Sequence, residues 1–401
     1  KQRARLITLF AQRLGASKEQ SAMGLFEVNE VFVENRNVKT KFRVPGYLNL
    51  VKRLGAGAYG CVAAFKDSRS GRKVAVKKIT SAFDDELDGK RILREVKLLR
   101  QLNHPNILQI VDILPPDSPD FEDIYIVTEL MDSDLHKVIT SPSCQFGEDH
   151  RKFIMYQLFK GMVYLHSASI VHRDLKPANL LIDRQCHLKI CDFGLARVVA
   201  SNEDDMTDYV VTRWYRAPEL ILAPSEYTEA IDNWSAGCIM FELVARQPLF
   251  KGKDCCDQIR QILKVLGSPP EEDIKWITEQ QARDFVRRFM QTKKVEWSQL
   301  LPESNSHAVE VIDSLVRFVP STRSSSEEVL HFGYFKELFE EQDVETCAGP
   351  ADFSFDKFEA TKPLLQSYIY GECASFHPEI LERDQALLSP KQVAALFGQA
   401  L

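Results

Sequence analysis

The residues between positions 172 and 192 include the polar groups needed to transfer a phosphoryl group to a hydroxyl. Asp174 has a carboxylate that can orient a hydroxyl and accept its proton, and Lys176 supplies a cation two residues later. Asn179 and Asp192 offer the oxygen ligands that magnesium prefers. Because magnesium bridges the phosphates of ATP, these four side chains predict a site for ATP and Mg²⁺.

Two short strands are expected to hold the magnesium ligands in place. Short apolar segments predict strands at 180–182 and 188–190, joined as a hairpin. Asn179 directly precedes the first strand, and Asp192 follows the second. The hairpin would therefore fix both side chains on a rigid base.

A glycine-rich stretch lies nearer the N-terminal end, between two predicted strands. Gly55, Gly57 and Gly60 permit a tight turn and let backbone N–H groups approach phosphate oxygens. Alone, this pattern also fits an ordinary hairpin, and in a dinucleotide-binding fold a helix would follow it. Here a strand follows instead, and Lys77 lies on the next predicted strand.

The predicted secondary structure around these motifs changes from strands to helices along the chain. Alternating apolar residues predict strands at 47–54, 61–65 and 73–79. Helical spacing begins after Asp149. Glu95 lies on an earlier helical pattern with a packed apolar side, which makes it the candidate carboxylate partner of Lys77. The alternative is that Glu95 belongs to a solvated helix face.

The composition excludes several classes of protein. The chain has 401 residues, 44% hydrophobic and 27% charged, which is enough for two or three cores. A formal net charge of −6 argues against a general nucleic-acid binder. No apolar run approaches the ~20 residues that cross a bilayer. The nine cysteines form no CxxC pair, and the odd number suggests reduced intracellular thiols rather than a disulfide framework.

Three motifs at fixed spacing resemble those of protein kinases. They are His172-Arg173-Asp174, Asp192-Phe193-Gly194 and Ala217-Pro218-Glu219. The resemblance implies an α+β, two-lobed protein kinase fold, with a small antiparallel β lobe carrying one main helix and a large, mainly helical lobe. It also implies that Glu219 pairs with Arg323. A pseudokinase is an alternative, but such proteins usually lack one of the catalytic or metal-binding residues, and none is missing here.

The resemblance also implies a division of the chain. The expected parts are an N-terminal arm at 1–45, a small lobe at 46–130, a large lobe at 131–340, and an extension at 341–401. This extension is expected to wrap back over the kinase domain.

The Thr207-Asp208-Tyr209 sequence narrows the resemblance to the mitogen-activated protein (MAP) kinases, which are doubly phosphorylated at this position. Residues 210–219 are similar to their P+1 loop, and residues 353–356 resemble the start of their C-terminal extension. The resemblance implies a proline-directed serine/threonine kinase activated by an upstream dual-specificity MAP kinase kinase. A cyclin-dependent-like kinase is the alternative enzyme, although such kinases lack the second acceptor. A nucleotide-binding scaffold is the alternative without catalysis.

The same resemblance assigns roles to individual residues. The catalytic set would comprise Asp174, Lys176, Lys77, Glu95 and Thr212. The nucleotide would contact Leu54, Gly55, Gly57, Gly60, Val62, Ala75, Lys77, Glu129, Met131, Asp134 and Leu181, and the metal would contact Asn179 and Asp192. Phospho-Thr207 would be bound by Arg94, Arg173 and Arg197, and phospho-Tyr209 by Arg213 and Arg216, because each phosphate adds about −1.5 to −2 charges.

The expected partners are proteins. They are protein substrates, the upstream kinase and basic docking peptides, which would contact Glu340 and Asp343; a plain solvated helix end is the alternative for these two residues. Neither nucleic acid nor a membrane is expected as a partner. The resemblance suggests a monomer that resides in the cytoplasm and the nucleus.

The two ends of the chain carry further helical patterns. Residues 1–15 form a basic amphipathic pattern, expected to pack on the kinase body, with a membrane surface as the alternative. Residues 389–397 begin with a capping-box sequence and continue with an apolar side. The hypothesis for this second segment is that it docks on the kinase body and tunes activity.

Overall fold

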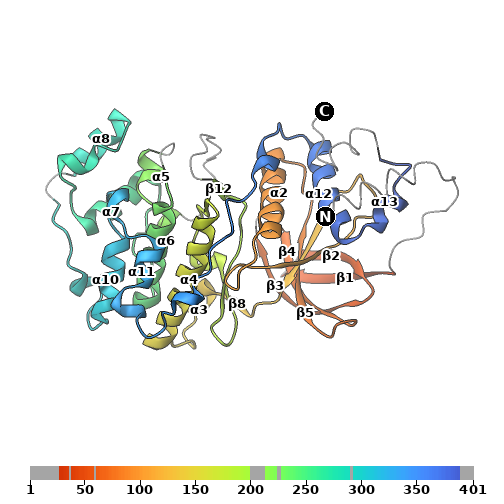
Figure 1. Cartoon of the computed structure of the whole chain (residues 1–401), viewed down its shortest axis with the longest axis horizontal. Helices are drawn as coiled ribbons and strands as arrows, with labels where there is room; N and C mark the ends of the chain where they lie inside the picture. The colour runs from red at the N-terminus through yellow and green to blue at the C-terminus, as the bar shows by residue number, and fades with distance from the viewer. Residues whose placement is uncertain are drawn as a thin grey trace. The chain divides into compact units, whose positions relative to one another are not determined.

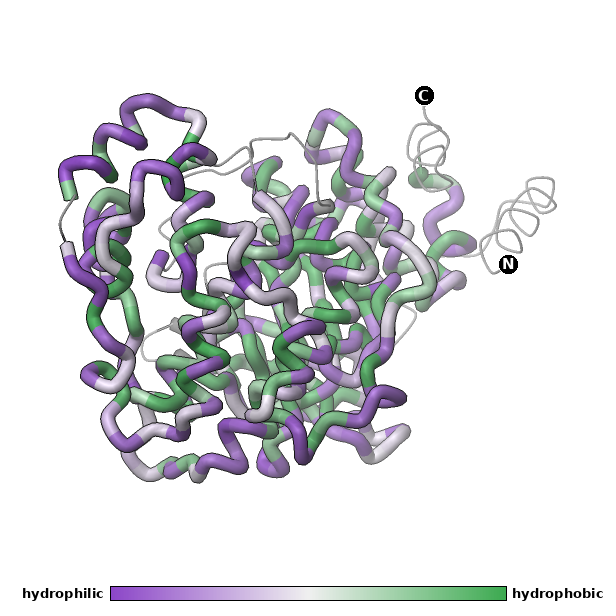
Figure 2. Tube along the Cα trace, turned by 60° about the vertical axis from the view of Figure 1, so that its left-hand side comes forward, coloured by the Kyte–Doolittle hydropathy of each residue, from purple (hydrophilic) through white to green (hydrophobic). Residues whose placement is uncertain are grey.

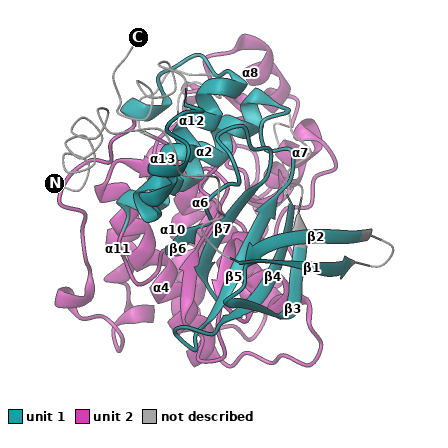
Figure 3. Cartoon of the chain, turned by 90° about the vertical axis from the view of Figure 1, so that its right-hand side faces the viewer, with its two compact units in different colours: residues 1–102, 108–130, 354–401 teal, residues 103–107, 131–353 magenta. Residues whose placement is uncertain are grey.

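The computed structural model describes residues 27–35, 38–57, 60–198, 213–223, 227–289 and 292–388. The helices expected at 1–15 and 389–397 lie outside these ranges. Two compact units make up the chain: unit 1 comprises residues 1–102, 108–130 and 354–401, and unit 2 comprises residues 103–107 and 131–353 (Figure 3). This division differs from the expected one at both ends, because unit 1 includes residues 38–45 and unit 2 includes residues 341–353.

Unit 1 contains a five-stranded antiparallel sheet with the strand order β3-β4-β5-β7-β6 (Figure 1). The strands are β3 (Leu48–Gly57), β4 (Gly60–Asp67), β5 (Lys73–Ile79), β6 (Ile110–Ile113) and β7 (Ile124–Glu129). The first three confirm the strands predicted from apolar alternation. A hairpin of β1 (Val28–Asn35) and β2 (Val38–Pro45) precedes them and shares a hydrophobic cluster with the sheet.

The described residues of unit 1 include three helices: α2 (Glu86–Gln101), α12 (Lys362–Phe376) and α13 (Glu379–Arg383). Buried residues of α2, including Leu93 and Val96, share one core with Leu365 and Ile369 of α12 and with the sheet. At Gly89 of α2, a Cβ would lie 2.7 Å from Cδ1 of Leu365, so the close approach of α12 depends on this glycine. The C-terminal segment is therefore part of the core of unit 1.

Charged and polar side chains fasten this segment to α2 and the sheet. Lys97 of α2 pairs with Glu372 of α12. The amide of Gln366, which is buried, donates to the carbonyl oxygen of Phe121 at 2.8 Å. Because α2 also carries Glu95, the position of this candidate catalytic helix is supported from the C-terminal segment.

His377, just after α12, should make the attachment of the C-terminal segment sensitive to pH. Its Nε2 lies 2.7 Å from Asp112, and its Nδ1 lies 3.5 Å from Glu379. Burial lowers the pKa of His377, but the hydrogen bond and charge of Asp112, with Glu379, outweigh it and raise the pKa above the usual value. The attachment is therefore fully stabilised below about pH 6.5 and loses this contribution as the pH rises through the raised pKa.

Amide hydrogen exchange of α12 and α13 at pH 6 and pH 8.5 measures this effect. Residues 362–383 should exchange faster at the higher pH, after correction for the intrinsic rate, and His377→Gln should reduce the difference. His307→Gln is the control, because His307 is exposed and belongs to unit 2. An identical pH dependence in wild type and His377→Gln would contradict the assignment.

Unit 2 is mainly helical. Its helices are α3 (Leu135–Thr140), α4 (Glu148–Ser167), α5 (Glu219–Leu222), α6 (Ala230–Ala245), α7 (Cys255–Leu266), α8 (Gln280–Arg287), α9 (Trp297–Leu300), α10 (Ser306–Leu315) and α11 (Ser326–Leu330). The helical pattern expected after Asp149 is confirmed as α4. Along the Cα trace, hydrophobic stretches lie mostly inside and hydrophilic stretches on the outer turns (Figure 2). The antiparallel β unit and the helical unit confirm the expected fold class.

Two small sheets complete unit 2. The first has the order β11-β10-β8 and consists of β8 (Ser133–Asp134), β10 (Leu180–Ile182) and β11 (Leu188–Ile190). The second pairs β9 (Ile170–Val171) with β12 (Arg197–Val198). All nine cysteines are free. Within the described ranges, no helix is long and apolar enough to cross a membrane.

Candidate active site

Lys77 and Glu95 form an ion pair within unit 1. The Nζ of Lys77 on β5 lies 2.8 Å from Oε2 and 3.1 Å from Oε1 of Glu95 on α2. Their side chains are 26% and 13% exposed, so solvent screens the pair only in part. The predicted pairing is confirmed, and Glu95 is not a solvated helix-face residue. The carboxylate holds the ammonium at one place on the sheet.

The nucleotide-binding candidates of unit 1 lie on neighbouring strands around Lys77. Val62 on β4 is in register with both Gly55 on β3 and Lys77 on β5. Leu54 and Gly57 are also on β3, Ala75 is on β5, and Glu129 ends β7. Gly60 has a φ of 149°, and a Cβ there would stand 1.9 Å from the carbonyl oxygen of Lys78. Only glycine fits this position.

Asp174, Lys176 and Asn179 form a tight polar cluster in unit 2. Oδ2 of Asp174 accepts hydrogen bonds from Nζ of Lys176 at 2.6 Å and from Nδ2 of Asn179 at 3.0 Å. Burial raises the pKa of Asp174, the Lys176 ammonium opposes the rise, and the charge of Asp192 adds to it. A carboxylate with a raised pKa accepts a proton more readily, as a general base requires.

Asn179 and Asp192 lie at the two open ends of the β10–β11 hairpin. The hairpin prediction is confirmed, since β10 pairs antiparallel with β11. The N–H of Cys191 donates to the carbonyl oxygen of Asn179 at 3.0 Å and so joins the two ends. Asp192 follows with a φ of 67°, a conformation that non-glycine residues adopt at functional sites.

These residues fit Mg²⁺ that is bound together with phosphates. The amide nitrogen of Asn179 donates to the Asp174 carbonyl and carboxylate, which leaves its amide oxygen available to a cation. In the described part of the chain, no group of three or more His, Cys, Asp or Glu side chains could hold a metal. Mg²⁺ commonly takes one or two protein ligands and completes its shell with phosphates and water.

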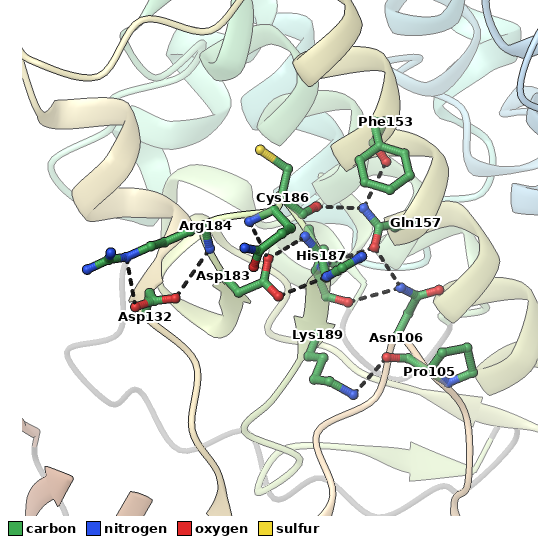
Figure 4. Close-up of polar contacts among 12 residues, drawn as sticks. Pro105, Asn106, Asp132, Phe153, Gln157, Asp183, Arg184, Cys186, His187 and Lys189 are labelled. Carbon is green, nitrogen blue, oxygen red and sulfur yellow. Dashed lines mark hydrogen bonds and ion pairs between the residues drawn. The ribbon is translucent and has the colours of Figure 1, made fainter. Parts of the chain in front are cut away.

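The far end of the hairpin is fastened by Gln157 and Asn106 (Figure 4). Gln157 of α4 donates to the carbonyl oxygen of Cys186 at 2.8 Å and accepts from the N–H of Leu188 at 3.0 Å. Asn106 donates to the carbonyl oxygen of Leu188 at 3.0 Å. Both amide side chains are buried. They hold the strands that position Asn179 and were not predicted from the sequence.

Asp232 of α6 supports the residues just before Asp174. Its carboxylate accepts the backbone N–H groups of His172 and Arg173 at 2.8 and 2.9 Å. Burial by itself raises the pKa of Asp232, but hydrogen bonds and charge from His166, with those of His172, lower it overall. Asp232 therefore remains ionised and fixes the backbone of His172 and Arg173, which precede Asp174. Sequence reasoning did not identify this role.

Three of the candidate phosphate-binding arginines have identified partners other than phosphate. Arg94 is buried in unit 1 and pairs with Asp356, with Nη2 3.0 Å from each carboxylate oxygen. Arg173 donates to the hydroxyl of Tyr227 at 3.0 Å. Arg213 donates to the carbonyl oxygen of Lys253 at 2.9 Å. The pairing of Arg94 with Asp356 was not expected from the sequence.

Several other candidate site residues lie on or next to short strands and a 3₁₀ turn. Arg197 on β12 is in register with Val171, two residues before Arg173. Asp134 on β8 pairs with Leu181 on β10, both in unit 2 with Met131. Arg216 follows a 3₁₀ turn at Arg213–Tyr215. Thr207, Tyr209 and Thr212 lie outside the described residues.

The candidate docking residues lie close together on the surface of unit 2. Glu340 and Asp343 are both exposed, and the N–H of Asp343 donates to the carbonyl oxygen of Glu340 at 2.9 Å. The turn between them is a 3₁₀ helix at Glu341–Asp343. The exposure of this turn leaves both carboxylates accessible to a basic peptide. It is equally consistent with the alternative, a solvated helix end without a docking role.

Comparison with known proteins places the chain in a family. A protein kinase domain model matches residues 48–335. Extracellular signal-regulated kinase 1 of Dictyostelium discoideum is 47% identical over 85% of this chain, although the match spans 64% of that protein. Mitogen-activated protein kinase 3 of Arabidopsis thaliana is 42% identical over 88% of this chain and 94% of its own length. Mitogen-activated protein kinase 4 of the same plant is 43% identical over 83% of this chain and 88% of its own length. The chain thus belongs to the MAP kinase family and is a serine/threonine protein kinase.

Proposed function

We propose that this chain is a proline-directed MAP kinase that acts within a phosphorylation cascade. It transfers the γ-phosphoryl group of ATP, bound with Mg²⁺, to serine or threonine followed by proline in protein substrates. Two observations carry the proposal: the Lys77–Glu95 ion pair within unit 1, and the cluster of Asp174, Lys176 and Asn179 within unit 2. A nucleotide-binding scaffold has no need of a largely enclosed carboxylate, 13% exposed, held beside a lysine.

The residues divide the chemistry among them. Lys77 holds the α- and β-phosphates. Asn179 and Asp192 would hold Mg²⁺, which would supply positive charge to neutralise the phosphate oxygens. Asp174 orients the substrate hydroxyl and accepts its proton. Lys176 neutralises charge that develops on the transferred group. The Gly-rich turn contributes backbone N–H groups to the phosphates.

Regulation acts through Thr207 and Tyr209, as the resemblance of this motif to that of MAP kinases suggests. An upstream dual-specificity kinase phosphorylates both residues, and arginines then order the segment by charge-assisted hydrogen bonds. Arg173, Arg197 and the Arg213–Arg216 pair supply these contacts. Basic docking peptides of the partners bind Glu340 and Asp343. The protein acts as a monomer in the cytoplasm and the nucleus.

A peptide assay with an upstream kinase tests the proposal. Activated protein should phosphorylate a Ser-Pro peptide at least about tenfold faster than the matched Ser-Ala peptide, a difference of about 1.4 kcal/mol in transition-state binding. Thr207→Ala combined with Tyr209→Phe should bind ATP normally and remain inactive.

Three outcomes would contradict parts of the proposal. Full activation of the double variant would exclude the dual-phosphorylation switch. Activity that requires a cyclin and is indifferent to Tyr209 would identify a cyclin-dependent-like kinase. If the wild-type protein binds ATP but transfers phosphoryl groups no faster than Asp174→Asn, only the scaffold function remains.

A further inference from the structure

The chain carries four Ser-Pro dipeptides of its own. They begin at Ser118, Ser141, Ser268 and Ser389. A proline-directed kinase has to reach both the serine hydroxyl and the proline that follows it. Ser389 lies outside the described residues, so the structure compares the other three.

Two of the three are poorly accessible. The hydroxyl of Ser268 donates to the carbonyl oxygen of Phe289 and accepts the N–H of Thr292 at 2.9 Å, and Pro269 is buried. Ser118 is partly buried, and Pro119 after it is buried. A kinase would have to detach both segments before it could bind the proline.

Ser141 is partly buried like Ser118, but the proline that follows it is exposed. It follows α3 in an extended conformation, with φ −73° and ψ 120°, at the start of an irregular loop that runs to Gly147. Pro142 and Ser143 are both exposed. Its hydroxyl lies 2.9 Å from that of Ser143, at the surface. The N–H of Cys144 donates to the carbonyl oxygen of Ser141 at 3.3 Å, so the exposed proline lies in a surface turn, where a kinase can reach it without detaching a buried segment.

Arg246 stands beside this serine. Its Nη2 donates to the carbonyl oxygen of Ser141 at 2.7 Å, and its side chain is exposed. Arg246 ends α6 in the left-handed conformation, with φ 59°, where glycine or asparagine fits the backbone better. The chain thus keeps a guanidinium next to Ser141 at a backbone position that disfavours it. The guanidinium has further N–H groups, and these can donate to a phosphate.

We infer that Ser141 is a phosphorylation site for proline-directed kinases and that Arg246 binds the resulting phosphate. A bond forms between Oγ of Ser141 and the γ-phosphorus of ATP as the bond to the bridging oxygen breaks. ADP leaves, and the hydroxyl proton passes to the catalytic aspartate of the kinase. The phosphate then draws Arg246 into a charge-assisted pair and orders residues 141–147. Phosphorylation by this chain itself rests on the proposed function.

Two kinases acting on one inactive acceptor test the site. Asp174→Asn protein is incubated with MgATP and either activated wild-type protein or an active cyclin-dependent kinase, and phosphosites are mapped by mass spectrometry. Ser141 should be labelled in both reactions and Ser268 in neither. Ser141→Ala should abolish the label, and Ser143→Ala should retain it.

Hydrogen exchange then tests the role of Arg246. Phosphorylation should slow amide exchange in residues 141–147 by about tenfold in protein with Arg246, as expected for a new charge-assisted contact. Arg246→Asn, which suits the left-handed backbone, should be phosphorylated equally but show no slowing.

The outcomes separate this inference from the proposed function. If the cyclin-dependent kinase labels Ser141 but wild-type protein labels neither Ser141 nor a Ser-Pro peptide, the site stands and the proposed function fails. If both kinases label the peptide but neither labels Ser141, the site is excluded. Equal slowing in wild type and Arg246→Asn would exclude Arg246 as the phosphate-binding residue.

Discussion

Replacing Asp174 with asparagine is expected to lower phosphoryl transfer by about 100- to 10,000-fold, the usual contribution of a general base. Asparagine keeps the size of the side chain and one oxygen for Lys176 or Asn179. It cannot accept the proton of the substrate hydroxyl. The binding of MgADP should be nearly unchanged, because the metal and phosphate ligands lie on other residues. Steady-state transfer to a Ser-Pro peptide and equilibrium dialysis with MgADP measure the two quantities.

Asp132→Asn is a suitable control for this experiment. Asp132 belongs to the same unit and is partly exposed, and its carboxylate lies 3.5 Å from Arg184 (Figure 4). Such a surface pair contributes about 1 kcal/mol or less, so the control should retain activity. A full transfer rate in Asp174→Asn, or an equal loss in both variants, would show that Asp174 is not the base.

The parts of the site that the sequence predicted are those with fixed motif spacing. Lys77 and Glu95 are 18 residues apart on a strand and the helix that follows it. Asp174 and Asn179 lie in one loop, five residues apart. Such local geometry follows from secondary structure, so residue type and spacing were sufficient. The order of strands and helices could be predicted for the same reason, because apolar periodicity reports which face of an element is buried.

The contacts that the sequence did not predict join distant segments. Arg94 contacts Asp356, which is 262 residues away in the sequence, and His377 contacts Asp112, which is 265 residues away. Residue types supply many possible pairs of opposite charge, and no periodicity selects among them. Gln157 offered a weaker signal, as a polar residue beside the buried Tyr156 and Leu158 of α4. Its partners are backbone groups of the hairpin, which no side-chain pattern reveals.

The pairing of Arg94 with Asp356 changes the expected role of this arginine. A guanidinium that is buried with a carboxylate is already neutralised, so a phosphate would have to share it or displace Asp356. The expectation that Arg94 binds phospho-Thr207 thus carries the cost of breaking or sharing this buried pair.

Glu219→Gln is expected to lower the free energy of unfolding strongly, because it leaves the buried guanidinium of Arg323 without its counter-charge. The two groups form two hydrogen bonds of 2.5 and 2.8 Å, and their side chains are 1% and 0% exposed. Removing one partner of such a pair typically costs about 3–5 kcal/mol, because the other charge remains buried. Arg323 also donates to backbone carbonyls of Ala230 and Arg317, so it cannot simply turn to solvent.

Tryptophan fluorescence during urea unfolding measures this loss for unit 2 alone. The chain has four tryptophans, at 214, 234, 276 and 297, and all four belong to unit 2. Trp234 lies 4.9 Å from the Arg323 guanidinium and reports directly on the pair. Glu337→Gln is the matched control, since it removes an exposed partner of Lys152 and should cost about 1 kcal/mol or less.

The double variant Glu219→Gln with Arg323→Met separates the buried charge from the lost contact. If the uncompensated charge causes the instability, the double variant should recover much of the stability that Glu219→Gln loses, because neither charge is then buried alone. A loss in Glu219→Gln no larger than that in Glu337→Gln would mean that water reaches Arg323 freely. In that case Glu219 would not anchor the end of the activation segment through a buried ion pair.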